Sequence, residues 1–387
     1  MLRSGRAAEW LAPVERNASE VAWLEVAHGI CYLVANAAPV EAPAKDRACN
    51  AVHHAGRAHG KVERGPANRG CSLVKIVFHY DAGPALRVRL ATLAESGLDV
   101  SVCPVGDREG FARHMRDAEV LWHVLEPVTE ATIEASPRLR LIQKIGVGVN
   151  TIDLEAARRR GIHVCNMPGT NSRAVAEATL ALMLAALRRV PSFDAATRRG
   201  EGWSWQPELQ DDLLEIGGRC VGLVGYGSVP RVLAPILRAM GVEVIYHARS
   251  PKHEAVGEFC SLPELLARAD IVSLHVPLDD GTRHMIDAKA LAAMKVGSLL
   301  VNTARGGLVD EAALVDALRS RRLRAAALDT FDEEPTPQSN PLLQLENVVV
   351  SPHLAWLTSE TLDRSVAVAA ENCGRLAAGE TLLHSVP

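Results

Sequence analysis

This chain of 387 residues lacks the features of several specialised protein classes. No stretch of 18 apolar residues is free of charge, so we expect no membrane-spanning segment and no membrane partner. Lys and Arg number 42 against 46 Asp and Glu, which gives a formal net charge of −4. Because nucleic-acid-binding proteins usually present a basic surface, this balance argues against a nucleic-acid partner.

The eight cysteines are scattered along the chain. None forms a Cys-x-x-Cys pair or stands at zinc spacing with two histidines. Scattered thiols of this kind are typical of a cytoplasmic protein rather than of a disulfide framework. The pair His53-His54 has no cysteine or carboxylate at ligand spacing, so we expect no metal site.

The first 72 residues differ from the rest in composition. They are rich in alanine, and their longest apolar stretch, 21–38, is interrupted by Glu25, His28 and Asn36. Acidic residues precede this stretch, which a signal or transit peptide would avoid. We therefore expect residues 1–72 to be a poorly ordered extension, and whether they belong to the native protein stays open.

From Lys75 onward, short apolar runs alternate with helical stretches. The first strands are expected at 75–80, 100–103, 120–124 and 139–145, and a long apolar helix at 171–189. Later strands are expected at 220–224, 242–247, 271–275, 298–302, 325–328 and 348–350, and a closing helix at 358–378. Ser261 and Asp310 are expected N-caps of two intervening helices. This alternation predicts parallel β-α-β units, and the length favours two domains.

A glycine turn follows the strand at 220–224. Gly225 permits the tight turn, and Gly227 lets the backbone approach a pyrophosphate at a helix N-terminus. Pro230 replaces the third glycine of the usual G-x-G-x-x-G motif, but proline is compatible with the first turn of a helix. Since the turn follows a strand and opens a helix, we predict dinucleotide binding here.

The end of the next strand bears on the choice of dinucleotide. NAD binding usually requires an acidic residue there for the ribose 2′-hydroxyl, but Ala248 occupies the position. Arg249 would instead pair with the 2′-phosphate of NADP. The structural alternative is a solvated surface arginine. The pattern favours NADP over NAD.

Three further blocks follow in order, and they carry a family resemblance. They are Asn302-Thr303-Ala304-Arg305-Gly306-Gly307, Asp329-Thr330-Phe331-Asp332-Glu333-Glu334-Pro335 and Ser351-Pro352-His353. With the glycine turn before them, they resemble the D-isomer-specific 2-hydroxyacid dehydrogenases over about residues 75–378. The resemblance implies an α/β fold of two doubly wound parallel-sheet domains. The expected parts are a flavodoxin-like substrate domain at 75–172 plus 355–387 and a Rossmann dinucleotide-binding domain at 173–354.

The chemistry of these blocks suits reduction of a 2-oxo acid. The reaction needs a cation for the carboxylate and carbonyl oxygens, which Arg305 provides, and a proton donor, for which His353 is suited. Glu334 would orient the imidazole and favour its charged form. The resemblance assigns the same catalytic roles to these three residues. Each residue alone has a structural alternative, namely a helix cap, a loop carboxylate or a buried histidine.

The resemblance also implies which residues bind the ligands. Backbone N–H groups around Val147 and Gly148 would hold the substrate carboxylate together with Arg305. Thr303 and Asp329 would lie along the nicotinamide half of the cofactor, and Val276 and Pro277 beside its adenosine half. The complete expected cofactor set is Gly225, Gly227, Ser228, Val229, Ala248, Arg249, Val276, Pro277, Thr303, Ala304 and Asp329.

Some positions depart from the family pattern or bear on assembly. Asn150 stands where the family usually has Asp, and Trp356 replaces a residue that is commonly small. Trp203 and Trp205 resemble an element that reaches a partner subunit in some relatives, so a homodimer is expected by analogy. Simple burial of these rings is the alternative.

The substrate is the least constrained part of the prediction. Because the chain ends soon after the closing helix, we expect it to lack the regulatory domain of many phosphoglycerate dehydrogenases. We also expect no Arg or Lys cluster beside Val147 and Gly148 to bind a phosphate. We therefore expect a small 2-oxo acid such as glyoxylate or hydroxypyruvate. The alternatives are an NAD-dependent dehydrogenase of another small acid or phosphonate-like anion, and a dinucleotide-binding corepressor or sensor. The intact catalytic set argues against the sensor.

Overall fold

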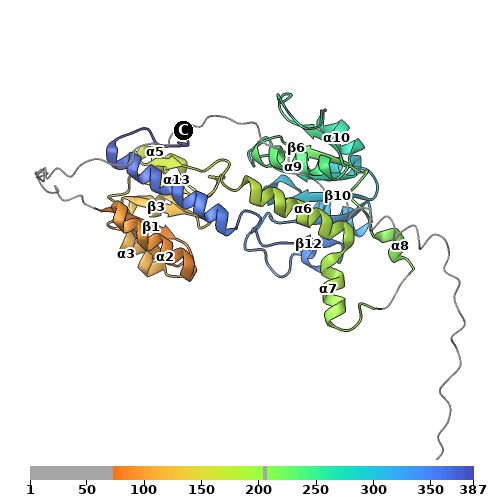
Figure 1. Cartoon of the computed structure of the whole chain (residues 1–387), viewed down its shortest axis with the longest axis horizontal. Coiled ribbons are helices and arrows are strands. Elements are labelled where there is room, and N and C mark those ends of the chain that lie inside the picture. The colour runs from red at the N-terminus through yellow and green to blue at the C-terminus, as the bar shows by residue number, and fades with distance from the viewer. Residues whose placement is uncertain (1–72, 204–206) are drawn as a thin grey trace, which may run out of the picture. The chain divides into compact units, whose positions relative to one another are not determined.

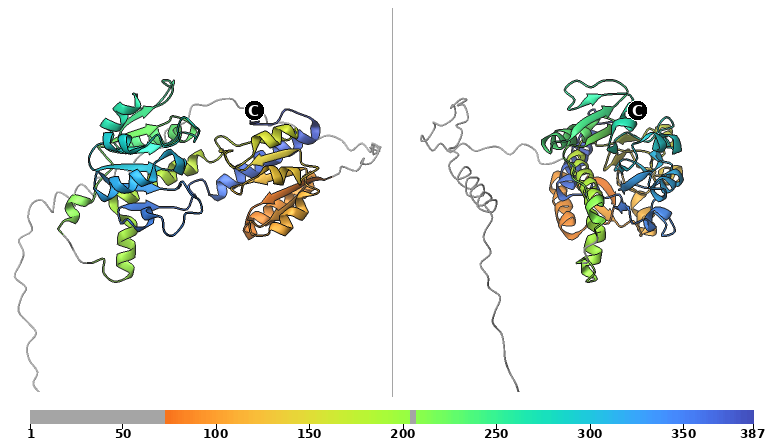
Figure 2. Two further views of the ribbon diagram at one scale, coloured as in Figure 1. Left: turned by 180° about the vertical axis from the view of Figure 1, so that it is seen from behind. Right: turned by 90° about the vertical axis from the view of Figure 1, so that its right-hand side faces the viewer.

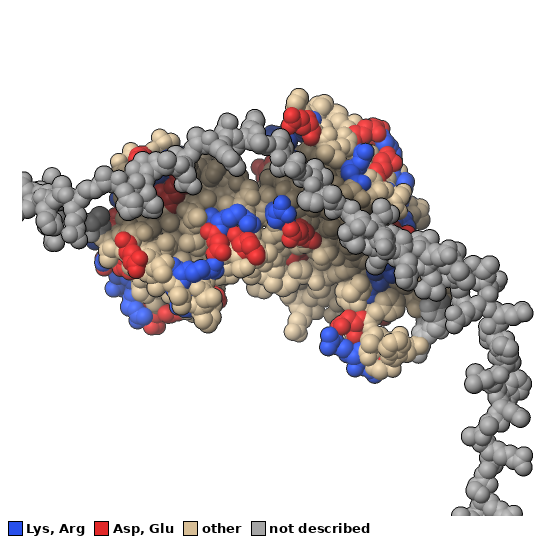
Figure 3. Space-filling model, in the orientation of Figure 1, with Lys and Arg blue, Asp and Glu red and all other residues tan. Residues whose placement is uncertain are grey.

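The computed structural model describes residues 73–203 and 207–387, which contain two parallel β-sheets with helices packed on them (Figure 1). The extension expected at residues 1–72 lies outside the described residues. Among the residues described, no helix combines the length and apolar character that crossing a bilayer requires. On the face shown in Figure 3, acidic and basic side chains are intermixed rather than gathered by sign.

The first sheet has five parallel strands in the order β2-β1-β3-β4-β5. This is the flavodoxin-like order, as expected. The strands are β1 Val74–His79, β2 Leu98–Cys103, β3 Val120–His123, β4 Leu141–Lys144 and β5 His163–Cys165. The connecting helices are α2 Pro84–Thr92, η1 Leu93–Ser96, α3 Arg108–Met115, α4 Glu130–Glu134 and α5 Leu154–Arg159. The sequence missed β5, because three residues are too few to show a periodic pattern.

The second sheet has seven parallel strands in the order β12-β11-β10-β9-β6-β7-β8. The strands are β6 Cys220–Val224, β7 Glu243–His247, β8 Glu258–Phe259, β9 Ile271–Leu274, β10 Ser298–Asn302, β11 Leu323–Leu328 and β12 Val348–Val350. Strands β7 and β8 lie on one side of β6, and β9 to β12 follow on its other side. The chain therefore reverses its direction across the sheet at β6, as in Rossmann folds and as expected. Only the two-residue strand β8 has no counterpart among the predicted strands.

Helices α9 Ser228–Ala239, α10 Leu262–Arg268, α11 Ala288–Ala293 and α12 Glu311–Arg319 connect the strands of the second sheet, with short helices η2 Gly306–Leu308 and η3 Pro341–Gln344. The two predicted N-caps are confirmed. The Ser261 hydroxyl accepts a hydrogen bond from the Glu264 N–H at 3.3 Å, and the Asp310 carboxylate accepts one from the Ala313 N–H at 3.1 Å.

Two long helices, α6 Ser172–Arg188 and α13 Ser359–Ala378, pack on different sheets (Figures 1 and 2). Met183 and Leu187 of α6 lie in the apolar core of the second sheet, whereas Ala369 and Cys373 of α13 lie in that of the first. The chain thus returns to the first sheet after completing the second. Helices α7 Val190–Arg198 and α8 Leu209–Asp212 follow α6. The exact domain boundaries stay a prediction.

The central strands of the first sheet place polar groups in a buried setting. Every residue of β3 and β4 is buried, and each strand ends in a basic residue, His123 and Lys144 respectively. In a doubly wound sheet, ligands bind beyond the carboxyl ends of the strands. These two side chains therefore lie at the edge where a ligand is expected.

Candidate active site

The glycine turn between β6 and α9 has the geometry of a pyrophosphate cradle. Gly225 has φ 97°, and a β-carbon there would lie 2.5 Å from the His275 carbonyl oxygen, so only glycine fits. Within the described structure, a β-carbon on Gly227 would meet nothing within 4 Å, and no side chain caps α9. The N–H groups of Ser228 and Val229 donate to no described residue. The turn therefore fits a dinucleotide pyrophosphate.

The loop after β7 presents Arg249 to solvent. Arg249 is exposed and forms no hydrogen bond or ion pair with any residue in the described part of the chain. The loop itself is held in place, because the Tyr246 hydroxyl accepts the Lys252 N–H at 2.9 Å. Gly225 donates its N–H to the His247 carbonyl at 2.8 Å, so this strand end adjoins the glycine turn.

The two residues expected beside the adenosine half of the cofactor, Val276 and Pro277, follow β9. Val276 lies against the glycine turn, since a β-carbon on Gly225 would come within 2.9 Å of its side chain. The Pro277 carbonyl accepts a hydrogen bond from the Thr282 hydroxyl at 2.7 Å. The structure thus brings Val276 together with Gly225.

Arg305 lies in the segment that follows β10. Asn302 shapes the bend by accepting the Ala304 N–H at 3.0 Å and donating its side-chain amide to the Arg305 carbonyl at 2.8 Å. Thr303 is held by the Thr179 hydroxyl at 2.9 Å. A β-carbon on Gly306 would overlap the backbone of Phe331, so this glycine allows the Arg305 segment to pack against the loop that carries Glu334.

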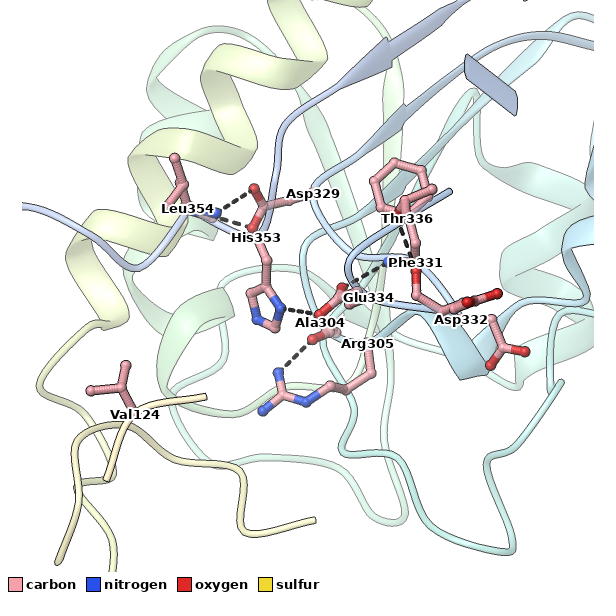
Figure 4. A network of polar contacts seen from close by, with 12 residues as sticks. Val124, Ala304, Arg305, Asp329, Phe331, Asp332, Glu334, Thr336, His353 and Leu354 are labelled. Atoms are coloured by element: carbon pink, nitrogen blue, oxygen red, sulfur yellow. Dashed lines mark hydrogen bonds and ion pairs between the residues drawn. The ribbon is translucent and has the colours of Figure 1, made fainter. Parts of the chain in front are cut away.

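His353 and Glu334 form a hydrogen-bonded pair (Figure 4). His353 Nδ1 lies 2.7 Å from Glu334 Oε2, and it is the donor because an ionised carboxylate can only accept. The other Glu334 oxygen accepts the Phe331 N–H at 2.9 Å. Burial raises the pKa of Glu334, but the hydrogen bonds and charges of His353 and Arg305 outweigh it and hold the pKa below its usual value. His353 Nε2 forms no hydrogen bond with any described residue.

Asp329 holds the turn that presents His353. His353 has φ 56° and donates its N–H to the Asp329 carbonyl at 2.7 Å. The Asp329 carboxylate accepts the N–H groups of Leu354 and Ala355 at 2.9 and 3.0 Å (Figure 4). Burial raises the pKa of this carboxyl group, against the effect of these bonds. The sequence suggested a cofactor contact for Asp329 and missed this positioning contact.

The loop 146–150 offers unpaired backbone donors next to Arg305. The N–H groups of Val147, Gly148 and Val149 donate to no described residue, whereas the carbonyls of Gly146 and Val147 are held by Met167 and Asn166. A β-carbon on Gly148 would overlap the Arg305 guanidinium. Burial lowers the pKa of Arg305, and the charge of Glu334 opposes that shift. Free N–H groups beside a cation suit a carboxylate ligand.

Lys144 is a single buried basic residue next to the loop that carries Val147 and Gly148. The side chain is only 5% exposed, its Nζ donates to the Val124 carbonyl, and it lies 3.4 Å from His123 Nε2. Burial first, and the positive charge of Arg305 second, lower the pKa of the Lys144 ammonium group. Sequence reasoning missed Lys144 because the order of the strands, which decides which residues lie together, is not visible in a local motif.

The residues that depart from the family pattern have different surroundings. Trp356 packs against the core of the first sheet, and its buried indole N–H has no partner in the described structure. Asn150 lies beside Gly148. Trp203 is 87% exposed, and Trp205 lies outside the described residues.

Within the described ranges, no group of three or more His, Cys, Asp or Glu residues could hold a metal ion.

Comparison with known proteins finds dehydrogenases and reductases similar to this chain. Residues 180–355 match the family described as D-isomer specific 2-hydroxyacid dehydrogenase, NAD binding domain. Glyoxylate reductase of Aeropyrum pernix is 42% identical over 274 residues, covering 68% of this chain and 82% of that protein. The crystal structure of TT0316 protein from Thermus thermophilus has a TM-score of 0.73 and 39% identity, covering 81% of this chain and 99% of its own.

A second relative extends well beyond the region that matches this chain. D-3-phosphoglycerate dehydrogenase of Methanocaldococcus jannaschii is 39% identical over 316 residues, covering 80% of this chain but 57% of that protein. The chain therefore spans little more than half the length of this relative.

Proposed function

The chain belongs to the D-isomer-specific 2-hydroxyacid dehydrogenase family, and on that premise we propose that it reduces glyoxylate or hydroxypyruvate to the corresponding 2-hydroxy acid, with NADPH preferred over NADH. The observation that carries the proposal is the meeting of Arg305 with the free N–H groups of the loop at Gly148. The hydrogen-bonded pair of His353 and Glu334 supplies the acid–base group that the reaction requires.

In this proposal, Arg305 and the N–H groups of Val147 and Gly148 bind the substrate carboxylate. The remaining guanidinium donors stabilise the negative charge that develops on the carbonyl oxygen. A bound reduced nicotinamide supplies the hydride for C2. His353 transfers its Nε2 proton to the carbonyl oxygen and keeps its Nδ1–H on Glu334. In the oxidation direction, neutral His353 accepts the hydroxyl proton at Nε2.

The cofactor would be held by the glycine turn and the N-terminus of α9. Ser228 and Val229 would donate to the pyrophosphate. Arg249 is exposed and unpaired among the described residues, and Ala248 brings no carboxylate to repel a 2′-phosphate. These two features support the preference for NADP. A homodimer and a cytoplasmic location complete the proposal by analogy.

The surroundings of Arg305 also suggest a phosphorylated 2-oxo acid as a second candidate substrate. The buried Lys144 adds a cation near Arg305, and one relative is named D-3-phosphoglycerate dehydrogenase. We therefore include the phosphorylated counterpart of hydroxypyruvate among the substrates assayed.

The test is the loss of reduced-cofactor absorbance, measured separately with NADPH and NADH. Glyoxylate, hydroxypyruvate, 3-phosphohydroxypyruvate, pyruvate and oxaloacetate serve as substrates, and a His353→Ala enzyme serves as the control. Turnover with NADPH and the two small unphosphorylated acids supports the proposal. Preference for the phosphorylated acid would replace the substrate, and preference for NADH would overturn the interpretation of Arg249. Cofactor binding without turnover of any acid would favour the sensor.

A further inference from the structure

Three basic side chains lie in register across the carboxyl ends of neighbouring strands in the first sheet. His79 of β1 pairs in register with His123 of β3, and His123 pairs with Lys144 of β4. His123 and Lys144 are 1% and 5% exposed. The catalytic scheme above uses none of the three.

Lys144 connects two loops that border the substrate site. Its Nζ donates to the Val124 carbonyl in the loop after β3. Its Cε lies under the turn after β4, since a β-carbon on Gly146 would be 3.5 Å away. His123 Nε2 adds a contact of 2.9 Å with the Thr151 hydroxyl. These side chains therefore lie directly beside the turn that carries the N–H groups at 146–148.

Among the described residues, no carboxylate acts on Lys144 itself. Within the described structure, Lys144 forms no ion pair with a carboxylate, and the charge that acts on it is the positive one of Arg305. A buried cation without a counter-ion is costly. Burial first, and the charge of Arg305 second, lower the pKa of Lys144 to about 7. An anion bound at Arg305 would supply the missing charge and favour the ammonium form.

We propose that Lys144 is a positioning residue for the anionic substrate, whose ammonium group holds the loop at Val124 against the turn at 146–148 and adds a second positive charge near Arg305. The inference rests on the proposed function, because it requires an anionic 2-oxo acid at Arg305. Substrate binding then takes up a proton at Lys144, so substrate affinity falls as the pH rises above about 7.

The groups around Lys144 do not titrate in the same range. Burial, with the charges of Lys144 and His79, lowers the pKa of His123 to about 2, so His123 stays neutral. Burial also lowers the pKa of His79, against the charges of Glu126 and Asp81. Arg305 stays charged at neutral pH. In this cluster, Lys144 is therefore the group that changes charge between pH 6.5 and 8.5.

The test compares Lys144→Met with Lys144→Arg, in steady-state assays from about pH 6 to 9. The control is Lys75→Met, at the opposite end of the same sheet, where Lys75 is half-exposed and paired with Asp117 at 3.4 Å. In the wild-type enzyme we expect KM to rise by up to about tenfold per pH unit above pH 7. In Lys144→Met, we expect KM at pH 6.5 to be about tenfold higher and to lose this pH dependence.

The conservative variant separates charge from structure. A guanidinium stays protonated, so Lys144→Arg should keep a low KM up to pH 8.5. In both variants, kcat should stay within about threefold of wild type and should keep its pH profile, because His353 and Arg305 are unchanged. Lys75→Met should behave as wild type.

Two results would overturn the inference. One is a Lys144→Met enzyme with the KM and pH profile of wild type, and the other is a wild-type KM that does not change between pH 6.5 and 8.5. Reduced-cofactor binding, followed by fluorescence, reports whether Lys144→Met is folded. If it is not, the wild-type and Lys144→Arg profiles decide. A wild-type enzyme that reduces none of the acids would reject the proposed function and this inference with it.

Discussion

A single methyl group at Gly148 offers a sharp test of the substrate site. A β-carbon there would overlap the guanidinium of Arg305 and lie 3.1 Å from the Asn150 side-chain oxygen. Gly148 does not adopt a positive φ, so its backbone accepts alanine without strain. The atoms that must move are the end of a flexible side chain, and the fold should therefore tolerate Gly148→Ala. The substitution displaces Arg305 while leaving its charge in the protein.

The expected loss follows from the hydrogen bonds of the displaced guanidinium. A hydrogen bond to a charged group contributes about 1.5–3 kcal/mol, because both partners are desolvated in the complex. Loss of one such bond in the transition state lowers kcat/KM by about 10- to 150-fold, at roughly 1.4 kcal/mol for each factor of ten. Melting temperature and reduced-cofactor affinity should remain those of the wild-type enzyme.

The assay is steady-state reduction of the best 2-oxo acid, with Gly106→Ala as the matched control. A β-carbon on Gly106 would meet no described residue within 4 Å, so this variant should keep the wild-type kcat/KM. If Gly148→Ala retained kcat/KM within about twofold of wild type, Arg305 would not act from its position against Gly148. The reasoning about the carboxylate site would then be wrong.

Three further predictions concern other parts of the chain. His353→Ala should lower kcat by at least about 100-fold while leaving reduced-cofactor affinity, measured by fluorescence titration, nearly intact, and unchanged turnover would reject the acid–base role. Arg249→Ala should raise the KM for NADPH about tenfold more than the KM for NADH, whereas equal effects would mean that Arg249 does not contact the 2′-phosphate. Burial lowers the pKa of His123 to about 2 and that of His275 to about 3, so the unfolded chain binds protons first below about pH 6.5. The free energy of unfolding, measured in urea, should therefore fall by up to about 1.4 kcal/mol per pH unit for each of these histidines, and a constant value between pH 7 and 5.5 would contradict this.

Local patterns were sufficient wherever a short segment carries its own physical signal. The strands at Cys220–Val224 and Ser298–Asn302 have the predicted bounds, because a buried parallel strand is a continuous apolar run. The N-caps at Ser261 and Asp310 could be identified because a short polar side chain before an apolar-periodic segment satisfies the first free N–H groups of a helix. Strands β5 and β8 were missed because they are too short for any periodicity.

The sequence by itself determined the family, the α/β class and the identity of the candidate catalytic residues, because each of these is written in contiguous motifs. Only the tertiary structure decided which groups meet. Gly148 and Arg305 are 157 positions apart, and their contact depends on the packing of segments from different sheets. In the sequence, Lys144 is one residue of an apolar run. Its position beside His123 follows only from the pairing of β3 with β4. Its missing counter-charge is a property of the buried space around it, and no local pattern encodes that space.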